Sequence, residues 1–536
     1  MIASKPLHLH CCLLRRYSTF ARFGGNTRTG WKRKTFRLGS ALLAGGLLFC
    51  GYHALAPGFR VCECDQLPDY RVAIKKSRDL LRRVKDETGA PGIIVGVSID
   101  GKPVWQEGLG YADIENRVLC TEDTVMRIAS ISKSITMIAV AKLWEEGKLD
   151  LDKPVQEYVP YFPKKTYEGK KVDITCRHLV SHLSGIRHYE KNVKKEQEKL
   201  DNVSSKFLYY KFLKEDKDNK NKSTKESQEE LEMKEYFIKD KYENVKSALD
   251  LFKDDPLIHK PGTKFLYTTH GWTLVSAMVE AVVKEPFDVY ICKLFKELGL
   301  TKTYLDINEP IIYHRSRHYC KDKKGKVQNT PYVDNSYKWA GGGFLSTVGD
   351  LLKFGNIMLY SLQYADETED VGKISKETGE KQKTESPLPK KYKNSTSTEN
   401  QDKSSAESRQ MDECGRKLRG YLKRDTVKKL WTPVENTERP HEPELRYGMG
   451  WSVMSHKQDY GYCREQKFNA SHTGLAVGAC SILLILPRQC RGGMDAVDCK
   501  WDHPPQGTVI AVVTNLQGVG LRKVATEIAM LFDGIH

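Results

Sequence analysis

The spacing of apolar residues predicts a helix, a β-hairpin and a second helix in the first half of the chain. Residues 69–89, DYRVAIKKSRDLLRRVKDETG, have apolar positions at helical spacing and end at a glycine, which favours a helix terminus. Residues 92–110, GIIVGVSIDGKPVWQEGLG, form two short β-rich runs joined by Asp100-Gly101, a strong hairpin signal. Another helical pattern runs from about residue 130 to residue 146 and again stops at a glycine.

The C-terminal part of the chain returns to strand patterns. SHTGLAVGACSILLILP at 471–487 and GTVIAVVTN at 507–515 are apolar, β-branched runs, and LRKVATEIAMLFDGI after them has helical spacing. Strands near both ends with helices between them predict an α/β (α+β) fold: one antiparallel sheet of N- and C-terminal strands, flanked by helices, plus a helical lobe. We expect this domain to occupy residues 67–536.

Two charge-dense stretches interrupt these patterns. Residues about 190–246 are rich in Lys and Glu and show little apolar periodicity. Residues about 364–412 are rich in Lys, Glu, Ser and Thr and contain almost no large apolar residue. Both are predicted to be surface insertions, and the second to be disordered. They interrupt one domain rather than separate two, because strand patterns resume after them.

The N-terminal segment has a different composition, with ten Lys or Arg and no Asp or Glu in residues 1–62. Residues 1–37 are typical of a mitochondrial transit peptide. Residues 38–66 begin with a largely apolar run, 38–56, which indicates a sorting signal or membrane segment followed by a linker. Together they predict a mitochondrial protein of the intermembrane space or associated with the inner membrane. The alternative is a cleaved matrix presequence followed by a small apolar linker.

The charge and the cysteines exclude some classes of function. The formal net charge is +17, and residues 1–62 contribute +10, so the remainder carries only +7 (17 − 10). No Arg/Lys stripe with interleaved aromatic residues is present in the sequence, so we expect no nucleic-acid partner. The 14 cysteines lack the spacing of metal ligands. We therefore expect no metal site, and nothing in the sequence calls for another cofactor.

The most informative chemical pattern is Ser130-Ile-Ser-Lys133 at the start of the second predicted helix. Three-residue spacing on a helix places the two side chains on one face, close enough to hydrogen-bond. Ser130 would lie at the helix N-terminus, where free N–H groups and the dipole favour a developing anion. Lys133, among apolar neighbours, would be desolvated enough to act as a neutral base. Taken alone, these four residues are better explained as a serine helix cap followed by a solvated lysine.

Two segments further along the chain change that interpretation. HKPGTKFLYTTHGW at 259–272 places Tyr267 after a Pro-Gly turn, and ASHTGLAVGA at 470–479 places His472-Thr473-Gly474 in a buried strand. Ser-x-x-Lys, a loop tyrosine and a basic residue followed by Thr-Gly, in this order, resemble the serine β-lactamase and penicillin-binding-protein superfamily.

Other segments extend the resemblance to the class C β-lactamase-like branch of that superfamily. Residues 90–136 resemble its entry strands and nucleophile helix. CRHLVSHLSGI at 176–186 resembles its leucine-rich element with a histidine and Ser-Gly, and WAGGGFLSTVGDLLKFG at 339–355 resembles its glycine-rich strand and the following helix. The similarity covers roughly 85–360 and 420–533 and skips both insertions.

The resemblance implies a role for each matching residue. Ser130 would be the nucleophile that forms an acyl-enzyme, Lys133 would take or relay its proton, and Tyr267 would share the general acid and base work at the leaving group. Backbone N–H groups would form the oxyanion hole, where the loss of one donor typically costs about 10²–10³ in rate. The expected substrate cleft and oxyanion hole comprise Thr269, His472, Thr473, Gly474 and the backbone N–H groups of Ser130 and Leu475.

Two departures from the superfamily pattern affect the expected substrate. Its Tyr-x-Asn is here Tyr267-Thr268-Thr269, so a hydroxyl replaces the amide that would contact a substrate carbonyl. The basic residue of its Lys-Thr-Gly is His472, whose charge near neutral pH depends on its surroundings. We therefore expect no constant cation for a β-lactam carboxylate at this position. We expect a peptidase or esterase acting through the same acyl-serine rather than an efficient β-lactamase.

Three further features receive structural interpretations. His178 and His182 lie on a helix pattern and are read as core or capping histidines rather than catalytic ones. Gly341-Gly342-Gly343 lacks the following Gly-Lys-Ser/Thr of a phosphate-binding loop. It indicates instead a close backbone approach near the cleft.

Two functions from different classes remain open. The first is an acyl-serine hydrolase that cuts peptides or small acyl substrates; the second is a scaffold that keeps the fold to build a filament and has little or no hydrolytic activity. The resemblance implies both, because animal members are associated with filament assembly between the mitochondrial membranes and with effects on lipid metabolism. We therefore expect a homo-oligomer or filament with an inner-membrane association. Ser130, Lys133 and Tyr267 favour chemistry, whereas Thr269 and the 190–246 insertion keep the scaffold open.

Overall fold

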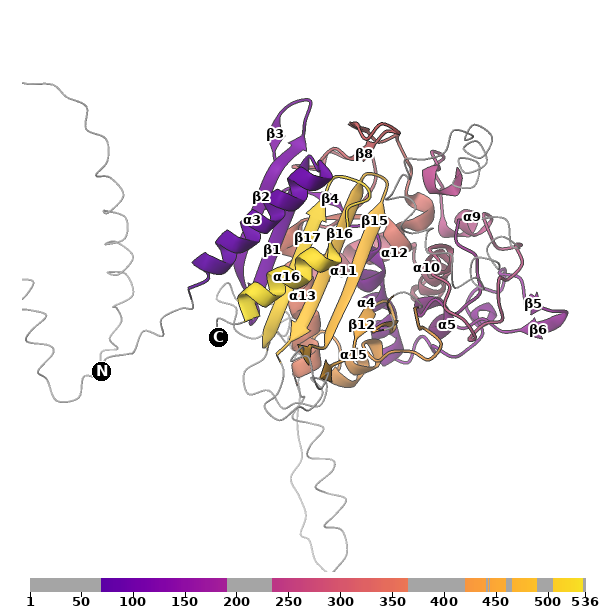
Figure 1. Cartoon of the computed structure of the whole chain (residues 1–536). Helices are drawn as coiled ribbons and strands as arrows, with labels where there is room; N and C mark the ends of the chain where they lie inside the picture. Colours follow the sequence, from indigo (N-terminus) through magenta and orange to yellow (C-terminus); the bar gives the residue numbers. More distant parts are fainter. Residues whose placement is uncertain are drawn as a thin grey trace, which may run out of the picture. The chain divides into compact units, whose positions relative to one another are not determined.

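Strands from the two ends of the chain form one sheet at the centre of the fold (Figure 1). The first strand pairs with the last in antiparallel register, from Ile93 opposite Thr514 to Ile99 opposite Thr508. This pairing confirms the predicted sheet of N- and C-terminal strands. The eight strands are all antiparallel to their neighbours and run in the order β11 (Leu445–Tyr447), β12 (Ser452–Met454), β15 (Asn469–Ala476), β16 (Ala479–Pro487), β17 (Gly507–Thr514), β1 (Gly92–Ile99), β2 (Lys102–Asp113) and β3 (Val118–Leu119).

The computed structural model describes most of the predicted domain. The predicted transit peptide, 1–37, and the predicted sorting or membrane segment, 38–66, lie outside the described residues, as do 190–233 and 365–412 of the two predicted insertions. Within the described part, no helix combines the length and the apolar run that a membrane crossing needs. The described residues are 69–189, 234–364, 420–439, 442, 444–458, 465–488 and 505–533.

Local sequence signals place the first helix and hairpin where they were predicted. α3 (Arg71–Thr88) ends at Gly89, whose φ of 64° is the left-handed conformation that glycine adopts at helix ends. The turn between β1 and β2 has positive φ at both Asp100 (47°) and Gly101 (79°), as a tight two-residue hairpin requires. α16 (Arg522–Asp533) forms the predicted C-terminal helix.

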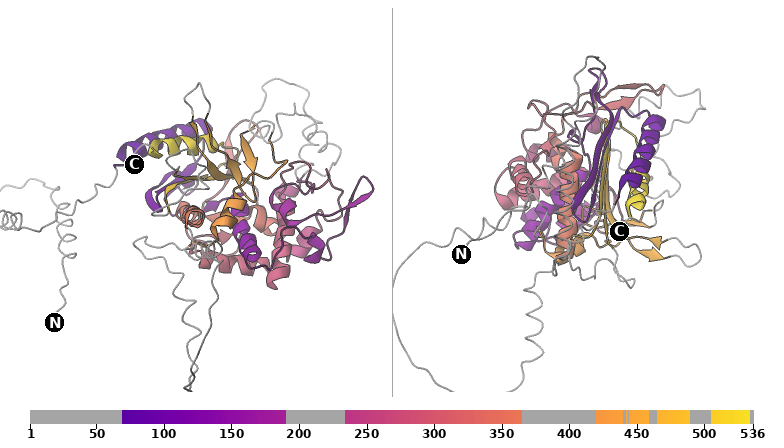
Figure 2. Two further views of the ribbon diagram at one scale, coloured as in Figure 1. Left: turned by 90° about the horizontal axis from the view of Figure 1, so that it is seen from below. Right: turned by 90° about the vertical axis from the view of Figure 1, so that its left-hand side faces the viewer.

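Helices cover both faces of the sheet (Figure 2). α3 and α16 pack on one face around an apolar cluster that includes Leu81 and Phe532. The other face carries α13 (Val348–Gln363) and α4 (Ile131–Glu145). Twelve of the 15 residues of α4 are buried, because this helix lies between the sheet and the helical lobe. The N-terminus of α4 therefore lies between the sheet and the helical lobe.

The helical lobe and the remaining short elements complete the domain. In a three-stranded sheet of the order β4-β10-β7, the N–H group of Phe344 donates a hydrogen bond to Ser132 Oγ at the start of α4. Among the residues that the structure describes, the other helices are α5 (Cys176–Val180), α9 (Val245–Leu249), α10 (His270–Val283), α11 (Phe287–Glu297), α12 (Trp339–Gly342), α15 (Arg424–Leu430) and the 3₁₀ helices η1 (Val155–Glu157), η2 (Lys234–Phe237) and η3 (Ser336–Lys338). The other strands are β4 (Met126–Arg127), β5 (Lys165–Tyr167), β6 (Lys170–Val172), β7 (Tyr304–Leu305), β8 (Tyr319–Lys321), β9 (Val327–Asn329), β10 (Phe344–Ser346), β13 (Lys457–Gln458) and β14 (Glu465–Gln466).

The end of the first predicted insertion packs into the domain. η2 belongs to the charge-dense range 190–246, yet Glu235 and Tyr236 are only 5% and 8% exposed. Tyr236 joins a small apolar cluster with Tyr189 and Tyr337. This packing could not be predicted, because a single Glu and Tyr within a charge run carry no periodic signal. Glu235 and Tyr236 are therefore part of the domain interior, so this range is not only a surface insertion.

Candidate active site

Ser130 stands at the N-terminus of α4 without capping it. Its side chain makes no capping hydrogen bond, and Ser130 is partly exposed while the helix behind it is buried. The preceding residue, Ala129, has a φ of 49°, a conformation that costs a non-glycine residue energy and is often found next to functional groups. The simple helix-cap interpretation of this serine is therefore wrong. Its hydroxyl is available at the helix N-terminus, where the dipole favours negative charge.

Lys133 is fully buried and points at this serine. Its Nζ atom lies 3.2 Å from Ser130 Oγ, and it also donates a hydrogen bond to the carbonyl of Gly341 in α12. Burial, aided by the positive charge of Lys338, lowers the pKa of Lys133 well below its usual value of 10.5. The solvated lysine of the simple interpretation is excluded. An amine with a lowered pKa at this distance has the chemistry of a base for the serine hydroxyl.

Tyr267 completes the group of three. Its ring lies beneath Lys133, with Nζ 4.8 Å from the ring centroid, and it is half-buried just before α10. The His182 ring packs against it, at 4.2 Å between centroids. Hydrogen bonds fix the loop: Thr268 N–H donates to His182 Nδ1 at 3.1 Å, and Thr268 Oγ1 donates to the carbonyl of Arg187 at 2.7 Å. The structure thus brings Ser130, Lys133 and Tyr267 together, as predicted.

Thr269 lies on the side of the loop that faces the lobe. Its N–H donates to His188 Nδ1 at 3.2 Å, and Thr269 is only 5% exposed. A Cβ atom on Gly341 would lie 2.7 Å from Thr269 Cγ2, so this glycine is required for the loop to approach α12. The close-approach interpretation of the glycine triplet is confirmed at this residue.

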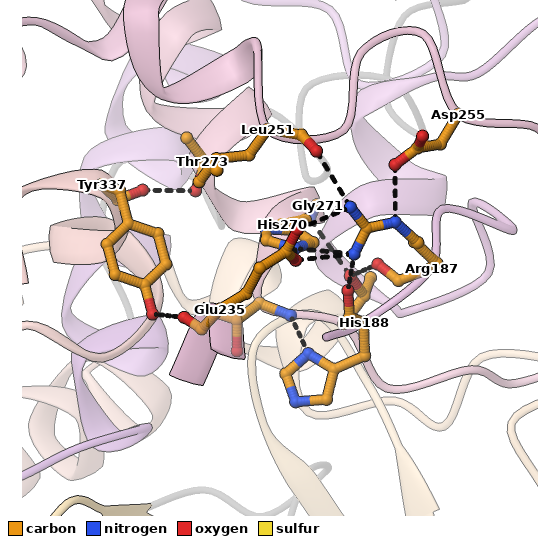
Figure 3. Close-up of polar contacts among 11 residues, drawn as sticks. Arg187, His188, Glu235, Leu251, Asp255, His270, Gly271, Thr273 and Tyr337 are labelled. Carbon is orange, nitrogen blue, oxygen red and sulfur yellow. Dashed lines mark hydrogen bonds and ion pairs between the residues drawn. The ribbon is translucent and has the colours of Figure 1, made fainter. Parts of the chain in front are cut away.

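A buried ion-pair cluster lies next to the loop that carries Tyr267 (Figure 3). The guanidinium of Arg187 binds both carboxylate oxygens of Glu235, at 2.7 and 3.0 Å, and its Nε lies 2.6 Å from Asp255. His270 Nε2 lies 2.9 Å from the same Glu235 carboxylate. Glu235 is held at a pKa of about 2 because hydrogen bonds and charges from His270 and Arg187 outweigh the effect of burial. Sequence reasoning missed this cluster, whose members lie far apart in the chain.

His472 is buried on β15 and is held as a neutral ring. Its Nε2 lies 2.9 Å from the hydroxyl of Tyr447, and its Nδ1 lies 2.8 Å from the carbonyl of Thr473. Nδ1–H therefore donates to the carbonyl, and Nε2 accepts from the tyrosine hydroxyl. Burial and the charge of Lys133 lower the pKa of His472 well below 6.5. This residue supplies no cation near neutral pH.

Gly474 allows β15 to approach the turn that carries the serine. A Cβ atom at this position would collide with Ser481 Oγ and with the carbonyl of Ile128, and it would lie 2.9 Å from Ala129 Cβ. The side chain of Leu475 packs with the cluster on the α3 and α16 face. Only its backbone is therefore left for the site, and the oxyanion role of the Leu475 N–H group stays a prediction.

His178 and His182 have the structural surroundings expected of a capping and a core histidine. His178 is the third residue of a capping box at the start of α5, with Thr175 as the cap. His182 is fully buried, and burial lowers its pKa well below 6.5. Its contact with Tyr267 was not foreseen, because that contact joins loops 85 residues apart (267 − 182).

Comparisons with known proteins agree with this geometry. The family model described as beta-lactamase matches residues 78–531. The human serine beta-lactamase-like protein LACTB, mitochondrial, is 48% identical over 483 residues, which cover 86% of this chain and 80% of the relative.

Solved structures share the fold at low sequence identity. EstCE1, described as a hydrolase with promiscuous acyltransferase activity, has a TM-score of 0.55 at 16% identity and covers 86% of this chain and 98% of its own. A class C beta-lactamase has a TM-score of 0.51 at 14% identity, covering 87% and 97%. The fold, the extent of the family match and the similarity to the human relative lead to one conclusion. The chain belongs to the beta-lactamase family.

Proposed function

We propose that this protein is a mitochondrial serine hydrolase, a peptidase or esterase, that works through an acyl-serine intermediate. The observation that carries the proposal is the environment of Lys133, which is 0% exposed and lies 3.2 Å from the hydroxyl of Ser130. Burial of a lysine without a carboxylate partner is costly. A pure scaffold gains nothing from a buried amine beside a half-exposed serine.

The side chains support a reaction in two halves. Ser130 Oγ attacks the substrate carbonyl carbon while its proton passes to the neutral amine of Lys133, and Tyr267 then protonates the leaving group as the carbonyl–heteroatom bond breaks. Water cleaves the resulting acyl-serine ester by the reverse use of the same groups. The backbone N–H groups of Ser130 and Leu475 are the proposed donors to the oxyanion.

The substrate class follows from the neutral state of His472. A β-lactam carries a carboxylate that needs a cation in the cleft, and the buried His472 ring gives none near neutral pH. This supports a peptide or small acyl substrate over efficient β-lactam hydrolysis. The name of the human relative supports a mitochondrial location. We further propose the intermembrane space or inner-membrane surface, a role in lipid metabolism and a homo-oligomeric state, as the resemblance implies.

Labelling of the serine tests the proposal directly. The purified full chain is treated with a fluorophosphonate, and intact mass is compared with Ser130→Ala and with Ser247→Ala, a matched serine whose hydroxyl only bonds the carbonyl of Asn244. We expect one adduct on the wild type and on Ser247→Ala, and none on Ser130→Ala. A folded wild type without an adduct would reject the hydrolase and leave the filament scaffold, which electron microscopy would then examine.

A further inference from the structure

The two proposed oxyanion donors come from separate segments of the chain. The N–H group of Ser130 follows β4, whereas the N–H group of Leu475 lies near the end of β15. In the described structure, β4 and β15 belong to different sheets, so no ladder of backbone hydrogen bonds fixes the distance between them. Catalytic groups must nevertheless be held within about 0.5 Å of their working geometry. Side chains must therefore set this distance.

Ser481 on β16 provides the first link between the two segments. It lies opposite Gly474 in the β15–β16 pairing, and its hydroxyl donates a hydrogen bond to the carbonyl of Ile128 at 2.7 Å. Gly474 makes this bond possible, because a Cβ atom there would collide with both Ser481 Oγ and the Ile128 carbonyl. Ser481 is only 1% exposed, so water does not compete for the bond. The hydroxyl thereby attaches β16 to a carbonyl two positions before Ser130.

The guanidinium of Arg127 provides the second link. Arg127 lies three positions before Ser130, and its Nη1 donates to the carbonyl of Val477 at 2.8 Å. Val477 follows Leu475 by two positions, at the turn from β15 to β16. A hydrogen bond from a charged donor is stronger than one from a neutral donor. This link therefore holds the far end of β15 against the segment that leads to Ser130.

Asp306 holds the guanidinium of Arg127 in place. Its Oδ2 lies 2.7 Å from Arg127 Nε and also accepts a hydrogen bond from Asn335 Nδ2 at 2.6 Å. The N–H group of Asp306 donates to the carbonyl of Gly343, directly before β10, and Leu345 of β10 pairs with Arg127 in β4. The Arg127 and Asp306 side chains are only 13% and 8% exposed. The head and the backbone of Arg127 are thus attached to one three-stranded sheet.

The two links reach the β15–β16 hairpin on either side of Leu475. Ser481 acts opposite the residue before Leu475, and Arg127 acts at the carbonyl two positions after it. Two attachment points fix both the distance and the relative rotation of the segments, whereas a single point would leave them free to pivot. The direction of the Leu475 N–H group relative to that of Ser130 therefore depends on both links.

We propose that Ser481 and Arg127 are positioning residues that hold the two oxyanion donors at the separation the reaction requires. Neither side chain bonds the substrate, because each acts through a backbone carbonyl, that of Ile128 or Val477. This inference rests on the proposed hydrolase function and adds two residues to it. Loss of either link should slow the chemical step and leave substrate binding unchanged, because the oxyanion forms only in the transition state.

The rate and the end point of serine labelling test the proposal in the full-length protein. Ser481→Ala and Arg127→Lys are treated with a fluorophosphonate, and the intact mass is followed over time. Arg127→Lys keeps a cation beside Asp306 but lacks the fork that also reaches Val477. We expect both variants to react about 10²-fold more slowly than the wild type, yet to reach one adduct per chain. A misfolded fraction would instead lower the end point.

A chromogenic ester separates binding from chemistry. With p-nitrophenyl butyrate, kcat and kcat/KM should fall by the same factor in both variants, so that KM stays the same. The double variant should lose less than the product of the two single effects, because both links fix the same separation.

Ser98→Ala and Arg78→Lys are the matched controls. Ser98 is a fully buried serine of the same sheet, and its hydroxyl contacts the side chain of Asn356 at 3.2 Å. Arg78 on α3 pairs with Glu107 at 2.8 Å. Neither contact involves the segment before Ser130, so both control variants should be labelled at the wild-type rate.

The outcomes separate the positioning role from the hydrolase. Wild-type labelling rates in Ser481→Ala and Arg127→Lys, or a KM that rises while kcat stays the same, overturn the positioning role alone. So does a lowered end point with an unchanged rate, an equal slowing of the controls, or a double variant whose loss equals the product. If the wild type takes no label, the hydrolase proposal fails and the positioning role fails with it.

Discussion

The carboxylate of Glu235 lies 2.7 Å from the guanidinium of Arg187, although 48 positions of sequence separate the two residues. Both side chains are buried, at 6% and 1% exposure. The carbonyl of Arg187 in turn accepts a hydrogen bond from the hydroxyl of Thr268, the residue after Tyr267. The end of a charge-dense segment is thereby connected to the loop that carries a proposed catalytic group.

Removal of the Glu235 charge should destabilise the fold. In Glu235→Gln, the buried guanidinium of Arg187 loses its best partner, which typically costs about 3–5 kcal/mol. Urea unfolding measures the change. Glu309→Gln is the matched control, because Glu309 pairs with Lys241 at 3.5 Å on an exposed surface and should lower the free energy of unfolding far less than Glu235→Gln does. If both variants lower the free energy of unfolding by similar amounts, the buried Arg187–Glu235 pair stabilises the fold no more than an exposed pair does.

The same carboxylate should make stability depend on pH. Its pKa is about 2 in the folded protein and 4.5 without such partners, so the folded state favours the ionised form. The stabilisation is present above pH 4.5 and is lost as the pH falls towards 2; the difference corresponds to about 3 kcal/mol. Unfolding free energies of the wild type should therefore decline over this interval more steeply than those of Glu235→Gln. Parallel curves would contradict the ion-pair assignment.

Replacement of Lys133 should lower the activity but raise the stability of the fold. Its folded-state pKa is lowered, so the unfolded chain binds more protons and this lysine opposes folding below its usual pKa of 10.5. Lys133→Met should lose several orders of magnitude in kcat/KM and gain about 1–2 kcal/mol of stability at pH 7. Activity of the wild type should rise with pH as the amine loses its proton, with a midpoint well below 10.5.

Another buried lysine, Lys165, provides the control for the Lys133 variant. Lys165 is also buried and also has a lowered pKa, but it donates to backbone carbonyls away from Ser130. Lys165→Met should keep the activity of the wild type. If it loses activity as completely as Lys133→Met does, the loss reflects damage to the fold and not to the chemistry.

Gly474 should matter for rate more than for folding. In Gly474→Ala, the new methyl group pushes against the carbonyl of Ile128 and Ala129 Cβ, so the Ser130 turn and the strand must separate. Misplacing one oxyanion donor should lower kcat/KM by about 10²–10³. Gly520→Ala, where a Cβ meets no atom within 4 Å, should leave it unchanged. An active Gly474→Ala would exclude the Leu475 N–H as an oxyanion donor.

Local signals account for what could be predicted from the sequence. Helical spacing placed Ser130 and Lys133 on one face, and a two-residue turn signal at Asp100-Gly101 set the hairpin. That Tyr267 and His472 lie beside Ser130 and Lys133 could be predicted only from the family resemblance, because no local signal shows contacts between elements so far apart in the chain. Lys338 and Glu235 escaped prediction for a related reason. Each lies alone in its segment, and its burial depends on partners from other loops.

The second predicted insertion should be removable, because the chain leaves and re-enters the domain at nearly the same place. Ser361 Oγ, near the end of α13, accepts hydrogen bonds from the N–H groups of Tyr421 (3.0 Å) and Leu422 (3.3 Å). Deletion of residues 365–412 leaves residues 413–419 to join the two ends, a reach of about 23 Å.

The shorter connection lowers the entropy cost of closing the loop by about 1–2 kcal/mol, so the melting temperature should be unchanged or slightly higher. Calorimetry of the deletion variant measures it. Ser361→Ala is the contrasting change, because it leaves the buried N–H group of Leu422 and the half-buried one of Tyr421 without their acceptor and should cost about 1–3 kcal/mol. A deletion variant that melts more than about 5 °C lower, a shift of roughly 3–4 kcal/mol for a domain of this size, would show that residues 365–412 stabilise the domain.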